Sequence, residues 1–362
     1  MTSYRQPFWK YVAAIAFCLP LILAGCSDSS ELENHWRDYL TRLARVLDRE
    51  ASTSPQDAFL HFPRPRDMAI TFADSNIDLL DFLRMRQCAL RETIAERNSI
   101  LGRHGDASAK LIFDLRFLSE AETCIDILHS EGKASLAATL REAVNLKQRE
   151  LPNRLFAAGI AGAEFREFWQ APPDLRSYHP DRGDDPSAAA LARWNRWQHQ
   201  WLAGNWQHDK DEMLSTLGEI RLGDGGALLK TQILNIRELN AAADIIDQRV
   251  SGRPLCLQAS PTPAAQQFRN VLSTYFISQV QRQASLINNH QFGVQSEITA
   301  IENELFAAMA ANGLTIPIAY LDWKKQRDDL LIESTQAQRQ HVKLAGALLA
   351  QCGLSPGGNN EN

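Results

Sequence analysis

The sequence predicts an all-α fold, a multi-helix bundle of antiparallel helical hairpins with about ten helices. Apolar residues recur at steps of three and four, as at Leu111, Leu115 and Leu118, and this spacing draws one apolar stripe along a helix. The strict alternation typical of a half-buried strand is scarce. Short connections between the periodic segments favour antiparallel neighbours. The sequence has no fixed-period repeat of the kind that builds a solenoid.

The first element, residues 1–25, is predicted to be a lipoprotein signal peptide that is cleaved. Arg5 and Lys10 come before an apolar run over residues 11–24, which is short for a membrane span of about 20 residues. The run ends in "LAGC" (23–26), which resembles the lipobox of bacterial lipoprotein precursors. The resemblance implies that the Cys26 thiol receives a diacylglycerol and that the chain is cut before it. A thiol suits this step because its thiolate is a good nucleophile.

The residue after the lipobox indicates whether a lipoprotein stays in the inner membrane or reaches the outer membrane. Ser27 stands where an aspartate would resemble a signal for retention in the inner membrane. We therefore expect a protein lipid-anchored to the periplasmic face of the outer membrane, with the inner membrane less favoured. Anchoring is firm with two or more acyl chains and weak with one. The alternatives are an uncleaved signal anchor and a cleaved signal with a soluble mature chain.

Four stretches rich in proline, glycine and small polar residues separate the later helices. They are "ASTSPQDAFLHFPRPRD" (51–67), "QAPPDLRSYHPDRGDDP" (170–186), "LGDGG" (222–226) and "SGRPLCLQASPTP" (251–263). Between them the apolar spacing predicts the helices. They are expected over residues 31–50, 76–100, 107–131, 133–149, 152–170, 187–204, 208–221, 226–250, 264–311 with a break near 292, and 317–351.

These breaks also suggest how the chain divides. The second stretch carries four prolines and is the strongest linker. We expect an N-terminal helical part over 26–170, a linker over 171–186, a C-terminal helical part over 187–351 and a disordered tail over 352–362.

Charge and motifs exclude several classes of function. Without Arg5 and Lys10 the mature chain carries 36 cations and 43 acids, a formal net charge of −7, so nucleic acid is not an expected partner. No CxxC or HExxH spacing indicates a metal site. The G-x-S-x-G element of serine hydrolases and the glycine-rich loops of nucleotide-binding proteins are absent too, so no cofactor is expected.

Four cysteines follow Cys26, and an even count in the oxidising periplasm suggests two disulfides. Three pairings are possible. Cys88 and Cys124 lie at similar distances from a bend between consecutive predicted helices, while Cys256 and Cys352 flank the last helices. We therefore favour the pairs Cys88–Cys124 and Cys256–Cys352. The alternative is four buried free thiols.

The most distinctive candidate for binding is "FPRPRD" (62–67), which holds two arginines and an acid between prolines. The planar fork of arginine suits carboxylate or phosphate. Downstream, "AERNSILGR" (95–103) supplies further polar residues near a helix end. In the alternative, structural interpretation the arginines pair with carboxylates or cap carbonyls. The candidate binding residues are Arg64, Arg66, Asp67, Glu96, Arg97, Asn98 and Arg103.

Tryptophans form a second distinctive pattern. Trp194, Trp197 and Trp201 recur at steps of three and four on one predicted helix. Such a stripe could stack on the sugar rings of peptidoglycan, but an aromatic stripe at helical spacing is more often buried core. We expect core here.

Several of these segments together resemble one family. The lipobox, "HWRDYLTRLARVL", "FPRPRD", "LLDFLRMRQCAL" with "IAERNSILGR", and "CIDIL" are similar to a family of proteobacterial lipoproteins known only as a domain of unknown function. The resemblance covers residues 30 to 350 and implies an outer-membrane or periplasmic lipoprotein. It carries over no catalytic residue.

We therefore predict a membrane-anchored, periplasm-facing lipoprotein of unknown biochemical activity. It would be a non-enzymatic scaffold or interaction protein of the cell envelope, and its partner would be an envelope protein or peptidoglycan. The alternative is an enzyme or binding protein that acts on peptidoglycan or a lipid, with Glu96, Arg64 and Arg66 in its site.

Overall fold

A computed structural model describes residues 30–50, 58–72, 84–179, 186–257 and 259–355. All regular structure in these ranges is helical, which confirms the predicted all-α class. The predictions for the signal peptide, Cys26, residues 76–83 and most of the tail lie outside the described residues.

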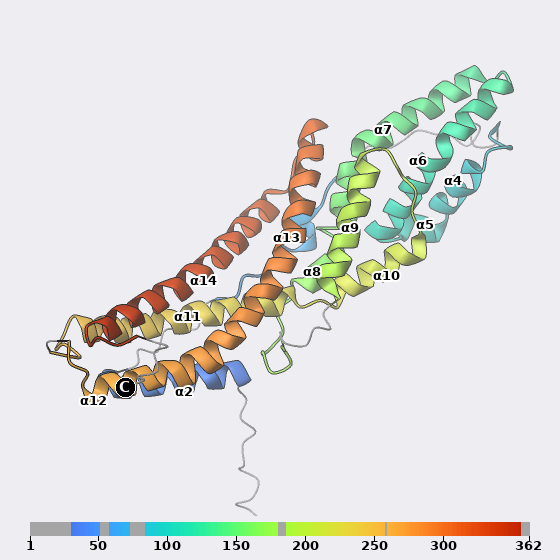
Figure 1. Ribbon diagram of the computed structural model, residues 1–362. Coiled ribbons are helices and arrows are strands. Elements are labelled where there is room, and N and C mark those ends of the chain that lie inside the picture. Colours follow the sequence, from blue (N-terminus) through green and yellow to red (C-terminus); the bar gives the residue numbers. More distant parts are fainter. Residues whose placement is uncertain (1–29, 51–57, 73–83, 180–185, 258, 356–362) are drawn as a thin grey trace, which may run out of the picture.

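The elements keep the chain order shown in Figure 1. They are α2 (Glu31–Leu47), the 3₁₀ turn η3 (Pro65–Met68), α4 (Leu90–Asn98), α5 (Ile100–His104), α6 (Ala107–Ser130), α7 (Ala134–Ala158), α8 (Ala163–Phe168), α9 (Ser187–Leu202), α10 (Lys210–Arg221), α11 (Gly225–Val250), α12 (Pro263–Val271), the π-helical η4 (Leu272–Gln281), α13 (Arg282–Ala311) and α14 (Ile318–Ala350).

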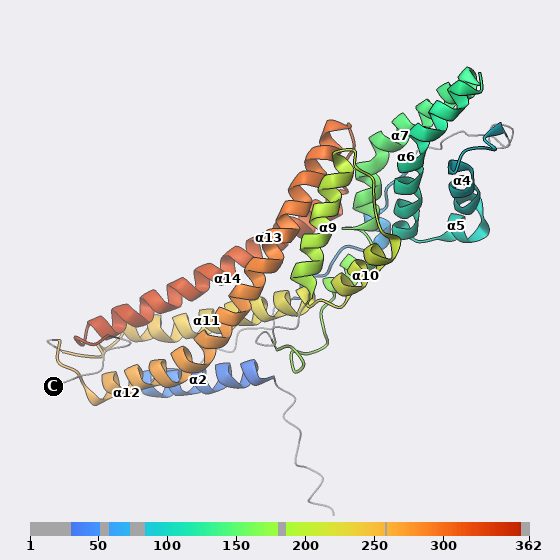
Figure 2. The same cartoon turned by 45° about the vertical axis from the view of Figure 1, so that its right-hand side comes forward.

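The molecule is elongated, with different helices at its two ends (Figure 1). The α6–α7 hairpin projects at one end, and α2, α11, α12 and the C-terminal part of α14 form the other. The second view agrees, and α13 runs obliquely from one half to the other (Figure 2). The blue helix α2 packs against α11, α12 and η4, so the start of the described chain joins helices late in the sequence.

Helix α2 shows why these segments are helical. A capping box opens it, in which Ser30 Oγ accepts from the Glu33 backbone N–H at 3.2 Å and Glu33 Oε2 accepts from the Ser30 N–H at 2.6 Å. Trp36, Tyr39 and Leu43, at steps of three and four, are buried on one face. The apolar stripe read from the sequence therefore becomes the packed face.

Buried apolar residues form two cores. The first core contains α4, α6 to α10, the C-terminal half of α13 and the N-terminal half of α14. The second core contains α2, most of α11, α12, η4 and the C-terminal end of α14. Long helices pass from one core to the other: Ile287 of α13 lies in the second and Val294 in the first.

The two cores do not divide the chain at the predicted linker over 171–186. Helix α2, from the predicted N-terminal part, packs in the second core. Helices α9 and α10, from the predicted C-terminal part, pack in the first. Within the linker, Leu175 is buried in the second core. The two halves of the sequence are therefore interleaved in space.

Two predicted helix breaks are wrong. A separate helix was expected to begin at 152, but α7 continues through Pro152, which is buried with Leu151 and Leu155. A proline inside a helix removes one backbone hydrogen bond, and here core packing on both sides offsets that loss. The break expected near 292 is absent too, because α13 is continuous there. The irregular helix lies upstream, in η4.

The helix expected over 76–100 is not continuous in the described residues, because residues 85–89 are not helical. Helix α4 begins at Leu90, and Ser99 ends it. Ser99 Oγ then accepts from the Gly102 N–H at 3.1 Å and so caps α5. A serine side chain that competes for backbone donors explains this end.

The favoured cysteine pairing is confirmed. Cys88 and Cys124 form a disulfide between the start of α4 and α6 in the first core. Cys256 and Cys352 form one between the linker before α12 and the end of α14 in the second core. Each core therefore holds one covalent crosslink. Among the described residues no helix is both long and apolar enough to cross a membrane.

Candidate functional site

The proline-rich segment over residues 58–68 lies across α11 and α14. The Phe62 ring packs edge-on against Trp323, with ring centroids 4.7 Å apart. Pro65 opens the short turn η3, whose Met68 is buried in the first core. Proline fixes the backbone angle φ and lacks the N–H that a helix interior needs. This segment therefore does not form a helix of its own and lies on the bundle as an irregular strap.

A groove of about 820 Å³ follows this segment, between it and the two helices. We call it the strap groove. Aromatic and aliphatic side chains and a few polar ones line it, as is usual for binding sites. Its apolar members include Phe59, Leu60, Phe62, Ile233, Ile236, Trp323 and Leu330, and its polar members are His61, Arg64, Asp67, Asp322, Gln326 and Glu333.

The strap groove carries more negative than positive charge. Arg64 is neutralised locally, since its Nε donates to Asp67 Oδ2 at 2.7 Å. The carboxylates of Asp322 and Glu333 are exposed, and no hydrogen bond or ion pair reaches them from the described residues. Two uncompensated acids over an aromatic floor favour a ligand that is both cationic and apolar.

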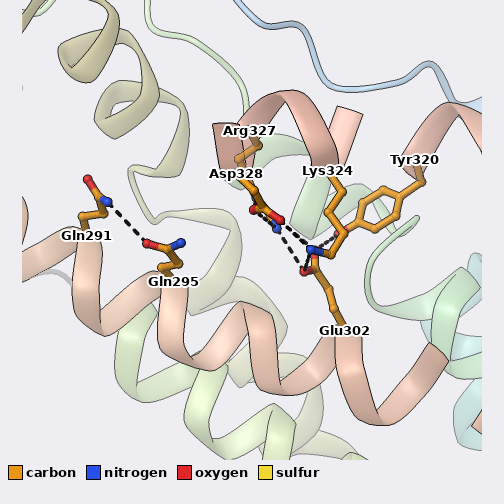
Figure 3. A network of polar contacts seen from close by, with 7 residues as sticks. All are labelled: Gln291, Gln295, Glu302, Tyr320, Lys324, Arg327 and Asp328. Atoms are coloured by element: carbon orange, nitrogen blue, oxygen red, sulfur yellow. Dashed lines mark hydrogen bonds and ion pairs between the residues drawn. The ribbon is translucent and has the colours of Figure 1, made fainter. Parts of the chain in front are cut away.

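A buried ion pair lies behind the groove floor (Figure 3). Arg327 donates to both oxygens of Glu302, with Nη1 2.7 Å from Oε1 and Nη2 3.0 Å from Oε2. Tyr320 Oη donates to Glu302 Oε1, and Lys324 Nζ lies 3.4 Å from Oε2. Arg327 also donates to Asp328 at 2.7 Å. The pair joins α13 to α14.

Electrostatics keep Arg327 charged and Tyr320 neutral. Burial alone lowers the pKa of Arg327, but the hydrogen bonds and charge of Glu302, with Tyr320 and Asp328, raise that pKa above its ordinary value. Burial, followed by the charge of Glu302, raises the pKa of Tyr320 well above its usual range. Glu302 is 0% exposed and Arg327 1%. The Glu302–Arg327 pair is therefore shielded from any ligand, and it acts by holding its neighbours.

One neighbour is the indole at the groove floor. The Arg327 guanidinium lies 5.2 Å from the Trp323 ring centroid and 5.6 Å from that of Trp169. The two indoles contact each other edge-on at 5.1 Å. The buried charge thus fixes the position of Trp323, on which Phe62 and the strap rest.

The structure does not bring the predicted binding residues into one site. Arg64 and Arg66 flank Asp67, and their side chains are 65% and 71% exposed. Glu96, on α4, pairs instead with Arg116 Nη1 at 2.8 Å. Among the described residues no hydrogen bond or ion pair links the strap arginines to Glu96, and the strap groove does not include it.

The remaining residues of that candidate cluster stay near the α4–α5 junction. Arg97 Nη1 donates to the Gly102 carbonyl at 3.1 Å, which is a local cap. Asn98 and Arg103 are exposed. The arrangement is a helix end with surface ion pairs, which contribute little to stability. A binding role for these residues stays a prediction.

The tryptophan stripe is core, as expected: Trp194 and Trp201 are buried and Trp197 is partly buried against them. Within the described ranges no group of three His, Cys, Asp or Glu side chains is placed to hold a metal ion.

Sequence reasoning missed the Glu302–Arg327 pair, although a signal was present. Tyr320, Trp323, Arg327 and Leu331 recur at steps of three and four, which places the arginine on the buried face of its helix. A charge at a core position indicates a buried partner, because an unpaired buried charge is costly.

A family model described as "Protein of unknown function (DUF3080)" matches residues 36–356. No curated protein and no solved structure matches the chain.

Proposed function

The chain belongs to the DUF3080 family, and we propose that it is a non-enzymatic lipoprotein that binds a partner protein in the cell envelope. Its anchor would be an acylated Cys26 on the periplasmic face of the outer membrane. The signal-peptide pattern over residues 1–25 and the lipobox support this placement. Two disulfides are in keeping with it, because they persist in oxidising compartments.

The strap groove is the observation that carries the binding role. Its aromatic floor would receive an apolar side chain of the partner, and Asp322 and Glu333 at its edge would pair with a lysine or arginine. The partner class is therefore a protein segment that combines basic and apolar residues. The groove is already walled by the segment over 58–68 and two helices, so binding does not require the bundle to open.

This geometry favours binding over the alternative of a peptidoglycan-acting enzyme. Such an enzyme would need Glu96 beside the strap arginines in one cleft, whereas Glu96 pairs with Arg116 on α6. Incubation of the purified protein with sacculi tests the alternative directly. Release of muropeptides would contradict the non-enzymatic proposal.

Crosslinking in intact cells tests the groove. A photo-crosslinking residue at Gln326, exposed in the groove on α14, should capture an envelope protein. The matched control is Gln336, exposed on the same helix outside the groove, which should capture far less. The double substitution D322N/E333Q should remove the Gln326 product, whereas D329N, on the same helix outside the groove, should not. Equal capture at both positions, or none at Gln326, would contradict the proposal.

A further inference from the structure

The second core contains an apolar pocket of about 400 Å³, which is separate from the strap groove and shares none of its lining residues. This volume lies within the range of about 300–1,000 Å³ that small-molecule sites have. The pocket is lined by Trp36, Asn235, Leu239, Phe276, Val280, Gln281, Ala284, Gln338, Arg339, Val342 and Lys343.

Its walls come from four segments of the bundle. Helix α14 packs on α11, α11 packs on α2, and α2 packs on η4. The pocket lies between α14 and the continuous helix formed by η4 and α13. The Phe276 and His341 rings meet across this gap, with centroids 4.4 Å apart. Asn288 Nδ2 donates to Gln338 Oε1 across it at 2.9 Å. These two contacts brace the two helices on either side of the pocket.

The interior suits a hydrocarbon. Trp36, Leu239 and Val280 are buried and contribute apolar surface. Trp36 Nε1 donates to Asn235 Oδ1 at 3.0 Å, and Asn235 Nδ2 donates to Gln232 Oε1 at 3.2 Å, so both side chains have their partners. The Gln338 Nε2, by contrast, is buried with no hydrogen-bond partner in the described part of the chain.

The mouth suits an anion. Arg339 and Lys343 line the pocket one helical turn apart on α14, and both are exposed. Among the described residues neither forms an ion pair. Two unneutralised cations beside an apolar interior select a ligand with an acidic head and an apolar tail.

The wall opposite α14 is the π-helical segment η4, which supplies Phe276, Val280 and Gln281. Wide π-helical turns are rare and occur frequently at functional sites. This departure from α-helical geometry widens the helix at the point where it faces the pocket, and it is an observation independent of the lining chemistry.

We propose that this pocket binds the acyl chain of an amphiphile whose acidic head group, a carboxylate or phosphate, pairs with Arg339 and Lys343. The chain lies between η4 and α14 over Trp36, and the head group remains at the exposed mouth. The proposal depends neither on the strap groove nor on a partner protein.

Binding of palmitate to the mature chain, residues 26–362, tests the pocket, with hexadecanol as the uncharged analogue. V342W fills the pocket from its half-exposed rim and should weaken palmitate binding about tenfold or more. I332W, at a similarly exposed position on the same helix outside the pocket, should leave binding unchanged. Circular dichroism should show the same helix content for both variants.

The charged mouth has its own test. R339Q/K343Q should weaken palmitate binding severalfold and leave hexadecanol binding unchanged, whereas K325Q, an exposed cation on the same helix, should affect neither. Palmitoyl lysophosphatidic acid distinguishes the source of the head group. Tighter binding than palmitate indicates a lysophospholipid, and weaker binding indicates a free fatty acid. The proposal is overturned if neither acid binds saturably, or if V342W and I332W weaken binding equally.

Discussion

The two cores bury polar groups of different kinds. The first core buries charges in pairs: Asp114 lies 2.5 Å from Lys147 and 2.7 Å from Arg154, and Glu302 lies against Arg327. In the second core the buried polar groups are mostly neutral. Gln232 donates to Gln291 at 2.6 Å and accepts from Ser334 at 2.5 Å, and Asn235 donates to it at 3.2 Å.

This difference predicts which core is more sensitive to substitution of a buried residue and which is more sensitive to acid. A buried ion pair is strongly destabilised when one partner is removed, because the other charge is left without compensation. A neutral network loses less for each group, but the second core also buries His341 against Tyr39 and Phe276, and protonation of this histidine would place a charge in an apolar site. Substitution of a buried charged residue should therefore lower the free energy of unfolding most in the first core. Acid should lower it through the second core.

The largest expected effect is loss of the disulfide in the second core. Cys256 and Cys352 are 96 residues apart, and Cys88 and Cys124 are 36 apart. In the chain-entropy model, C256A/C352A, which removes the disulfide of the second core, costs about 5 kcal/mol. C88A/C124A, which removes the disulfide of the first core, costs about 4 kcal/mol. Urea unfolding measures both. A larger loss for C88A/C124A would contradict the assumption that loop length decides.

The buried charge pair of the first core comes next. R327M removes the two hydrogen bonds and the charge that Arg327 supplies to the buried Glu302, and it should cost about 4 kcal/mol of unfolding free energy. The double variant E302L/R327M should recover much of this loss. R116M removes the partly exposed pairs with Glu96 and Glu120 and should cost about 1 kcal/mol or less. If R116M and R327M destabilise equally, burial is not what makes the Glu302–Arg327 pair important.

Acid should act on the second core through His341. Burial lowers the pKa of His341 to about 4 from an ordinary value of 6.5, so the unfolded chain binds this proton more readily. The contribution of neutral His341 to the free energy of unfolding is fully present above pH 6.5. It is lost as the pH falls toward 4, and the total loss is about 3 kcal/mol.

The variant that isolates this effect is H341Q. Its unfolding free energy should fall less between pH 7 and pH 4 than that of the parent chain, by about 3 kcal/mol. H129Q, at an exposed histidine, should keep the parent's slope. The interpretation fails if H341Q and H129Q show the same dependence on pH.

The smallest effect is expected at the strap groove. D322N/E333Q removes two exposed carboxylates that have no partner among the described residues, so thermal unfolding should change by no more than about 0.5 kcal/mol. Any loss of crosslinking in this variant would then report binding and not folding. A loss above about 2 kcal/mol would show that these acids are structural.

Local patterns predicted local features well. The apolar spacing gave the helices of residues 107–131 and 208–221 nearly to their ends, and similar distances from a bend identified the Cys88–Cys124 pair. The helix through Pro152 could not be predicted, because core packing from elsewhere in the chain offsets the lost backbone hydrogen bond.

Contacts between segments that are far apart in the chain could not be predicted from local sequence patterns. The interleaving of the two cores depends on α2 packing against helices more than 170 residues later in the chain, which no local spacing encodes. The strap groove forms where residues 58–67 meet α11 and α14. The sequence drew attention to "FPRPRD" for its arginines, whereas in the structure Phe62 fixes its position on Trp323.

The proposed placement in the envelope depends on the predicted lipid anchor at Cys26, and mass spectrometry of the purified protein tests that anchor most directly. We predict an N-terminal Cys26 that carries a thioether-linked diacylglycerol, and a C26S variant that is neither processed nor acylated. A mature chain that begins at another residue without an acyl group, or a C26S variant that is processed and fractionates with membranes as the parent does, would contradict the account.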